Sequence, residues 1–276
     1  MSKLATIIGV FIGSLIVLLS MIDFEKGRLL SAFFNWQGLL VVLGGTFAAT
    51  LINYPLSQMG CFFRGIGKVF ATEPESENEA IEQIIYLSHI AQSKGVLALE
   101  KEIELISDSF LRFALSEMMV YRDKEHLAVS LQNHINATRI RHINCQDVFN
   151  NMASYAPAFG MMGTVMGLIM MMTSQFSGDT GGSYVPGQSD DMLNSLLQGM
   201  GLALVTTFYG VLFANFVFIP IAGKLKVLSD AEALKNEILM YGVLGLKNEQ
   251  PPLMLRESMT AFVNEKNKER LEATLR

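Results

Sequence analysis

Charged residues are scarce in this chain. Of its 276 residues, 17% are Asp, Glu, Lys or Arg and 50% are apolar, whereas a soluble domain carries about a quarter charged residues. The deficit is local, which indicates a membrane protein with a soluble part. The net charge of −5 and the lack of a dense basic cluster argue against nucleic acid as a partner.

Cysteine is scarcer still. The chain has 2 cysteines, Cys61 and Cys145, and their separation matches neither a disulfide framework nor a zinc motif. The sequence therefore predicts two buried thiols without a special role.

The motifs of several common enzymes are also missing. No G-x-x-x-x-G-K-[ST], G-x-S-x-G or H-E-x-x-H occurs. Three of the 4 histidines recur every eight residues rather than at the three-to-five spacing of metal ligands. We interpret all of them as solvated or capping residues: His89, His126, His134 and His142. The sequence indicates neither an enzyme nor a tightly bound metal or cofactor.

Against these absences stand four long uncharged stretches, at 4–22, 36–56, 148–172 and 192–223. A helix rises about 1.5 Å per residue, so about 20 residues cross the ~30 Å hydrocarbon layer. The first stretch is long for the core of a secretion signal, and no A-x-A cleavage site follows it. We therefore expect four transmembrane helices, the first one retained.

None of these stretches contains Asp, Glu, Lys, Arg or His. Ionisable groups within a membrane are costly and usually mark an ion path. If this protein moves ions, another chain must bring the carboxylate.

Basic residues predict the orientation. Loop 173–191 has no Lys or Arg, whereas 57–147 and the tail after Gly223 hold nine each. By the positive-inside rule, both termini and segment 57–147 are cytoplasmic. The expected domains are spans one and two in 1–56, a cytoplasmic domain in 57–147, spans three and four in 148–223, and a tail in 224–276.

The cytoplasmic parts show helical periodicity. Acidic residues after Thr72 suit a helix start, Gly95 marks a break, and apolar residues recur at helical spacing through 96–120. Pro251 and Pro252 separate a last helix that is expected over 257–276. No segment alternates as a strand would, so the expected fold is an all-α integral membrane protein without a sheet.

Two of the spans carry a face of small residues. At 100° per residue, Pro157, Gly160, Gly163, Thr164, Gly167 and Met171 share one sector of span three. Span four repeats the pattern with Gly199, Ala203, Thr206, Thr207, Gly210 and Ala214. Small faces let helices approach closely. The hydroxyls either bond their own backbone carbonyls or line a polar path beside an inserted partner helix.

Several segments together resemble one known family. They are LLVVLGGTFAATLINYP (39–55), KGVLALEKEIE (94–104), RH (141–142), YAPAFGMMGTVMGLI (155–169) and ALVTTFYGVLFANFVFIPIAGKL (203–225). In this order they resemble the flagellar motor stator A-subunits of the MotA/PomA family, within the superfamily that includes ExbB and TolQ.

The resemblance implies a ring of copies, five in number, around two helices of a B-subunit. Each B helix carries a membrane aspartate, and the B-subunit binds peptidoglycan. Ion passage would turn the ring in the bacterial inner membrane and push a rotor switch-complex protein. The small face, including Gly160 and Thr206, would border the ion path and the partner helix.

The resemblance also implies roles for single residues. Pro157 and Pro220 match the family's two functional prolines, and Thr164 and Thr207 match hydroxyls of sodium-using members. This favours Na⁺ over H⁺, although threonine need not decide the ion. Glu100 matches an acidic rotor contact; its expected basic partner is Gln92 here, so Lys94 or Lys101 could substitute, or the rotor surface differs.

Other functions stay open. An ExbB/TolQ-like energiser of an envelope process is the first, although that branch usually has three spans. A related motor for gliding or phage defence is the second, and a plain channel or scaffold is the third. The outer loop 173–191 is longer and richer in glycine than the family's usual link. It would contact the partner, gather cations or be inert.

Overall fold

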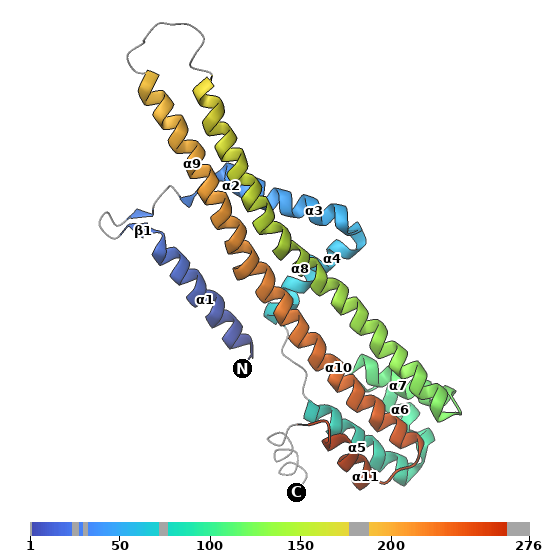
Figure 1. Cartoon of the computed structure of the whole chain (residues 1–276). Helices are drawn as coiled ribbons and strands as arrows, with labels where there is room; N and C mark the ends of the chain where they lie inside the picture. The colour runs from blue at the N-terminus through green and yellow to red at the C-terminus, as the bar shows by residue number, and fades with distance from the viewer. Residues whose placement is uncertain (1, 24–27, 30–32, 72–76, 177–187, 264–276) are drawn as a thin grey trace. The chain divides into compact units, whose positions relative to one another are not determined.

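The computed structural model describes residues 2–23, 28–29, 33–71, 77–176 and 188–263 (Figure 1). These residues are almost entirely helical, which confirms the expected helical class. The expectation of no sheet is wrong, because the described residues include one sheet of two short strands. Strands β1 (Ile22–Asp23) and β2 (Arg28–Leu29) pair antiparallel, Ile22 opposite Leu29. Such pairing satisfies backbone groups where the chain reverses.

Three helical segments are long and apolar enough to cross a membrane: 36–53, 124–173 and 196–247. The first is built from α2 (Trp36–Leu39), the π-helical turn η2 (Leu40–Gly44) and α3 (Gly45–Asn53). Helix α8 (Lys124–Phe176) forms the second. The third joins α9 (Gln188–Leu212), the π-helical turn η4 (Phe213–Phe218) and α10 (Ile219–Lys247).

The first expected span is also helical. Helix α1 covers Ser2–Ser20, and its described apolar part is the shorter stretch Ile7–Ser20. The helices thus suggest a multi-pass membrane protein, and the number of four spans stays a prediction.

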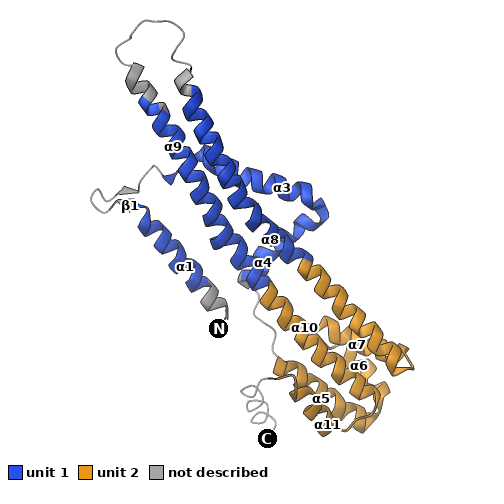
Figure 2. Cartoon of the chain, viewed as in Figure 1, with its two compact units in different colours: residues 1–72, 144–225 blue, residues 73–143, 226–276 orange. Residues whose placement is uncertain are grey.

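The chain divides into two compact units (Figure 2). Unit 1 comprises residues 1–72 and 144–225, and unit 2 comprises 73–143 and 226–276. Helices α8 and α10 each contribute residues to both units. The expected cytoplasmic limits at 57–147 and 224–276 stay predictions.

The core of unit 1 lies where α4 (Leu56–Ala71) packs on the middle of α8. Phe149 is fully buried there and its ring stacks on Phe62 at 5.3 Å between centroids. A side chain at Gly65 would meet the Phe149 ring at 3.0 Å. The buried face of α4 therefore needs a glycine where it meets the large aromatic ring.

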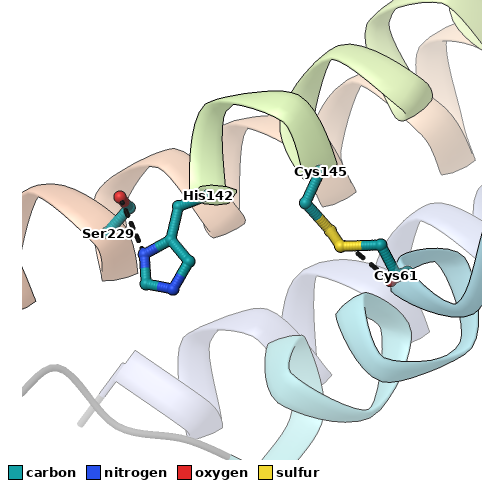
Figure 3. Close-up of a disulfide and its surroundings, with 4 residues drawn as sticks. All are labelled: Cys61, His142, Cys145 and Ser229. Atoms are coloured by element: carbon teal, nitrogen blue, oxygen red, sulfur yellow. Dashed lines mark hydrogen bonds between the residues drawn. A yellow bond between two sulfur atoms is a disulfide. The ribbon is translucent and has the colours of Figure 1, made fainter. Parts of the chain in front are cut away.

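A disulfide joins Cys61 of α4 to Cys145 of α8, with the two Cα atoms 5.7 Å apart (Figure 3). The prediction of two unpaired thiols was therefore wrong. The cysteines are 84 residues apart in sequence, and only the packing of α4 on α8 brings them within bonding distance.

Unit 2 is a helical domain with its own apolar core. It contains α5 (Glu77–Lys94), the 3-10 turn η3 (Val96–Ala98), α6 (Leu99–Ile103), α7 (Ser109–Val120) and α11 (Pro252–Thr260). Gly95 breaks the chain with φ 84°, as expected. Thr72, the expected helix start, lies outside the described residues.

The helix expected through 96–120 is interrupted. Helix α6 stops at Ile103, and Asp108 restarts the chain as the N-cap of α7, its carboxylate accepting from the Leu111 backbone N–H at 2.7 Å. Asp108 also pairs with Lys235 of α10. The last helix, α11, starts at Pro252 and ends at Thr260, earlier than the range expected for it, and residues 264–276 lie outside the described chain.

The interpretation of the histidines holds only in part. His126 is exposed and pairs with Asp123 at the start of α8, and hydrogen bonds from the Glu125 backbone and His126 lower the pKa of Asp123. His134, by contrast, stacks on the Phe113 ring at 4.3 Å. His142 Nδ1 lies 3.2 Å from Ser229 Oγ (Figure 3). These two side chains are partly exposed and join helices rather than cap them.

The disulfide gives the first prediction. Reduction of the purified, oxidised protein should lower its apparent Tm, because the bond closes a long loop and chain entropy assigns such a bond about 2–4 kcal/mol. The Cys61→Ser/Cys145→Ser variant should unfold at the lower Tm with or without reductant. Thermal unfolding in detergent measures both. Two free thiols in the oxidised protein would contradict the bond. Purified, oxidised protein is used because a reducing compartment would keep the two thiols free.

Candidate functional site

The small faces expected in spans three and four pack against each other. Helices α8 and α9 run antiparallel, so that early residues of one face late residues of the other. Their buried residues form a continuous seam, which we call the α8–α9 seam: Gly160, Gly163 and Gly167 on α8 with Gly199, Ala203, Thr206 and Gly210 on α9. The bulky residues opposite on α8 are exposed: Met162, Val165, Met166 and Ile169.

The seam brings backbone against backbone. A Cβ atom at Gly167 would lie 2.5 Å from the Gly199 carbonyl oxygen, and one at Gly210 would lie 2.7 Å from the Ala156 carbonyl oxygen. Both distances are shorter than real Cβ contacts. Lipid gives apolar side chains little reason to associate, so close packing of this kind is what holds membrane helices together.

Thr206 is sealed inside the seam. Its side chain is 0% exposed, and its hydroxyl lies 2.9 Å from the Leu202 carbonyl oxygen and 3.0 Å from that of Ala203. Its methyl group lies 3.2 Å from where a Cβ of Gly38 would be, so α2 packs on it as well. Assembly with other chains can only add burial. Thr206 thus lies inside the packing of the described chain, and its expected place on the ion path stays a prediction.

Thr164 and Thr207 stand at the edges of the seam and are partly exposed. Thr164 donates to the Met161 carbonyl oxygen at 2.6 Å, and Thr207 donates to that of Ala203 at 3.2 Å. Each hydroxyl therefore donates its hydrogen to a backbone carbonyl of its own helix. The lone pairs of each oxygen can still accept a hydrogen bond or contact a cation.

The two prolines have different surroundings. Pro157 lies inside α8, and its Cα is 3.1 Å from the position that a Cβ of Gly210 would take, so it borders the seam. Pro220 is exposed and is the second residue of α10, which begins where η4 ends. A proline has no N–H for the carbonyl four residues earlier, which suits the wider π-helical turn just before Pro220.

Comparison with known proteins covers nearly the whole chain. The model of the MotA/TolQ/ExbB proton channel family matches residues 102–238. Motility protein A of Treponema phagedenis is 32% identical over 272 residues, which cover 99% of this chain and 98% of that protein.

The chain belongs to the MotA/TolQ/ExbB family.

Two further comparisons, one of sequence and one of structure, agree with this membership. The chemotaxis protein PomA of Vibrio alginolyticus is 29% identical over 262 residues, covering 95% of this chain and 96% of PomA. The flagellar MotAB stator complex from Bacillus subtilis contains a chain that matches this one with a TM-score of 0.80 at 23% identity, covering 96% and 97% of the two chains. This structural match shows that the present chain has the same fold as that chain of the MotAB complex.

One contact within the present chain was not expected from its sequence. The buried Tyr209 of α9 donates its hydroxyl to the Phe33 carbonyl oxygen at 2.6 Å and accepts from the Asn35 backbone N–H at 3.2 Å. It fastens the start of α2 to α9. The available signal was the single tyrosine of span four, since a buried hydroxyl needs a partner.

The residues expected to face a rotor lie on the surface of unit 2. Lys94 ends α5, and Glu100 and Lys101 lie on α6; all three side chains are exposed. Gln92, where the resemblance leads one to expect a basic residue, lines a pocket of about 300 Å³ together with Glu249. The charged residues are accessible, but no described contact pairs Glu100 with either lysine.

The seam gives the second prediction. Gly210→Ala should destabilise the protein by about 1–3 kcal/mol, because its methyl group would meet the Ala156 carbonyl and force the helices apart. Gly201→Ala is the matched control, since nothing lies within 4 Å of its Cβ position. Thermal unfolding in detergent compares the two. Equal Tm values for both variants would show that the seam tolerates a wider spacing.

Proposed function

We propose that the chain is the A-subunit of a flagellar stator, which forms an ion-conducting unit with a B-subunit and converts ion-motive force into torque on the rotor. The near full-length match to motility protein A and PomA supports this function. The fold shared with the Bacillus subtilis MotAB stator complex supports it as well.

One observation carries the mechanism. The expected spans contain no Asp, Glu, Lys, Arg or His, while Thr164 and Thr207 are partly exposed residues at the edges of a tightly packed seam. The chain can border an ion path but has no group there that binds and releases a proton. A carboxylate on a B-subunit helix supplies that group, and an ion passing it changes its charge and its contacts with this chain.

The assembly must therefore bring the carboxylate of the B-subunit beside the threonines of this chain. Copies of the chain, five in number, surround two B-subunit helices in the inner membrane, with both termini in the cytoplasm. The seam lets each copy keep a fixed shape while the ring turns, because its backbones are in van der Waals contact. Pro157 borders the same seam, and Pro220 follows the π-helical turn.

The transported ion is Na⁺, with H⁺ as the alternative. A hydroxyl oxygen is a suitable ligand for a hard cation, and Thr164 and Thr207 are the site threonines that are partly exposed. One charge that crosses 100 mV releases about 2.3 kcal/mol, so either ion could drive the work.

The rotor contact involves Glu100 together with Lys94 or Lys101, which are exposed on α6 and at the end of α5. Opposite charges on the rotor switch protein steer such a contact, which salt should weaken.

The first test is gentle purification from the native host followed by identification of the co-purifying chain. We expect a single-span partner with a membrane aspartate and a peptidoglycan-binding domain. A partner with a small periplasmic domain and no wall anchor would instead identify an ExbB/TolQ-like energiser. A partner joined to a gliding or defence system would identify a related motor.

The ion assignment has its own test. Thr164→Val removes the hydroxyl of a partly exposed residue. It should raise the sodium concentration for half-maximal swimming speed by about five- to tenfold, because the loss of one hydrogen bond or similar contact costs about 1 kcal/mol. Thr206→Val makes the same chemical change inside the sealed seam and should leave that concentration unchanged. Swimming of the Thr164→Val cells that is normal in both sodium and potassium media would rule out the sodium role.

A further inference from the structure

Helix α4 carries a second amphipathic surface that neither the seam nor the ion path uses. We name it the α4 outer face; its residues are exposed and are Leu56, Gly60, Phe63, Arg64, Gly67 and Lys68. We propose that this face binds the anionic headgroups of phospholipids at the membrane surface. Such lipid binding is separate from torque generation.

The position of α4 favours lipid. Helix α3 ends at Asn53 and α4 begins at Leu56, so only Tyr54 and Pro55 separate them. Two residues reach at most about 7 Å. Since 36–53 is one of the apolar segments able to cross a membrane, the start of α4 lies at the membrane boundary.

The outer face has an apolar edge. Leu56 is 79% exposed and Phe63 is 76% exposed, and they are seven residues apart, two helical turns on the same side. Phe63 packs edge-on against Phe62 at 5.4 Å, and Phe62 stacks on the buried Phe149. Phe63 is thus the exposed end of a row of rings that begins in the core. Such a row orients one aromatic ring outward, as interfacial helices require.

The other edge is basic. Arg64 and Lys68 are one turn apart and exposed, and neither makes an ion pair with another described residue. Helix α4 contains no Asp or Glu. Basic residues beside a membrane attract anionic headgroups, and each contributes about a fivefold preference.

The middle of the face is open. Gly60 and Gly67 lie seven residues apart between the two edges, and no atom lies within 4 Å of the Cβ position of either. A headgroup can therefore approach the helix backbone while its phosphate meets Arg64 and Lys68.

The experiment uses tryptophan fluorescence of the intact complex in nanodiscs. The chain has 1 tryptophan, Trp36, so Phe63→Trp in a Trp36→Phe background places the only tryptophan of this chain on α4. The complex with Trp36→Phe alone supplies the background signal of the partner. Brominated phosphatidylglycerol and brominated phosphatidylcholine are each titrated over the same range of mole fractions.

We expect the anionic brominated lipid to reach half-maximal quenching at a mole fraction at least about fivefold lower than the zwitterionic one. Arg64→Gln/Lys68→Gln should remove this preference, whereas Lys94→Gln/Lys101→Gln, with the same change in net charge, should preserve it. Equal quenching by the two lipids before any charge is removed would overturn headgroup recognition. No quenching by either lipid would show that protein, such as a second copy, covers Phe63. Neither result depends on ion flow or motility.

Discussion

The structure of unit 1 depends on how closely two backbones approach. At Gly163, Gly167 and Gly210 the antiparallel helices α8 and α9 leave no room for a methyl group. In a membrane this contact replaces the hydrophobic driving force of soluble proteins. It also leaves Thr206 with no exposed surface, so a polar side chain stays inside the packing with its hydroxyl bonded to its own helix. Helix α2 then packs on the same threonine through Gly38.

This packing separates structural from accessible hydroxyls. Thr206 and Thr207 are neighbours in sequence, yet the first is sealed and the second is partly exposed. In the proposed stator, a fixed seam with Thr164 and Thr207 at its edges would let an ion-carrying helix move against it without deformation of the scaffold. The absence of carboxylates in the expected spans fits this role, because a charge on the scaffold would compete with the charge that the partner carries.

The second constraint is the attachment of α4 to α8. Phe149 and Gly65 fit together, and the Cys61–Cys145 disulfide lies beside them. The inner face of α4 is thereby committed to the core, which leaves Phe63, Arg64 and Lys68 directed away from it. The same helix therefore secures the core of unit 1 and presents a surface suited to the membrane boundary.

The sequence by itself determined the helical class, the apolar segments, the break at Gly95 and the two small faces, because each is a local pattern with helical period. It could not reveal the disulfide between Cys61 and Cys145, the restart of the chain at Asp108, or the anchoring of α2 by Tyr209. Each of these depends on which helix packs against which. Only the tertiary structure distinguished the buried Thr206 from the partly exposed Thr207. The two are adjacent in sequence, and the packing of α9 on its neighbours decides which side of the helix is covered.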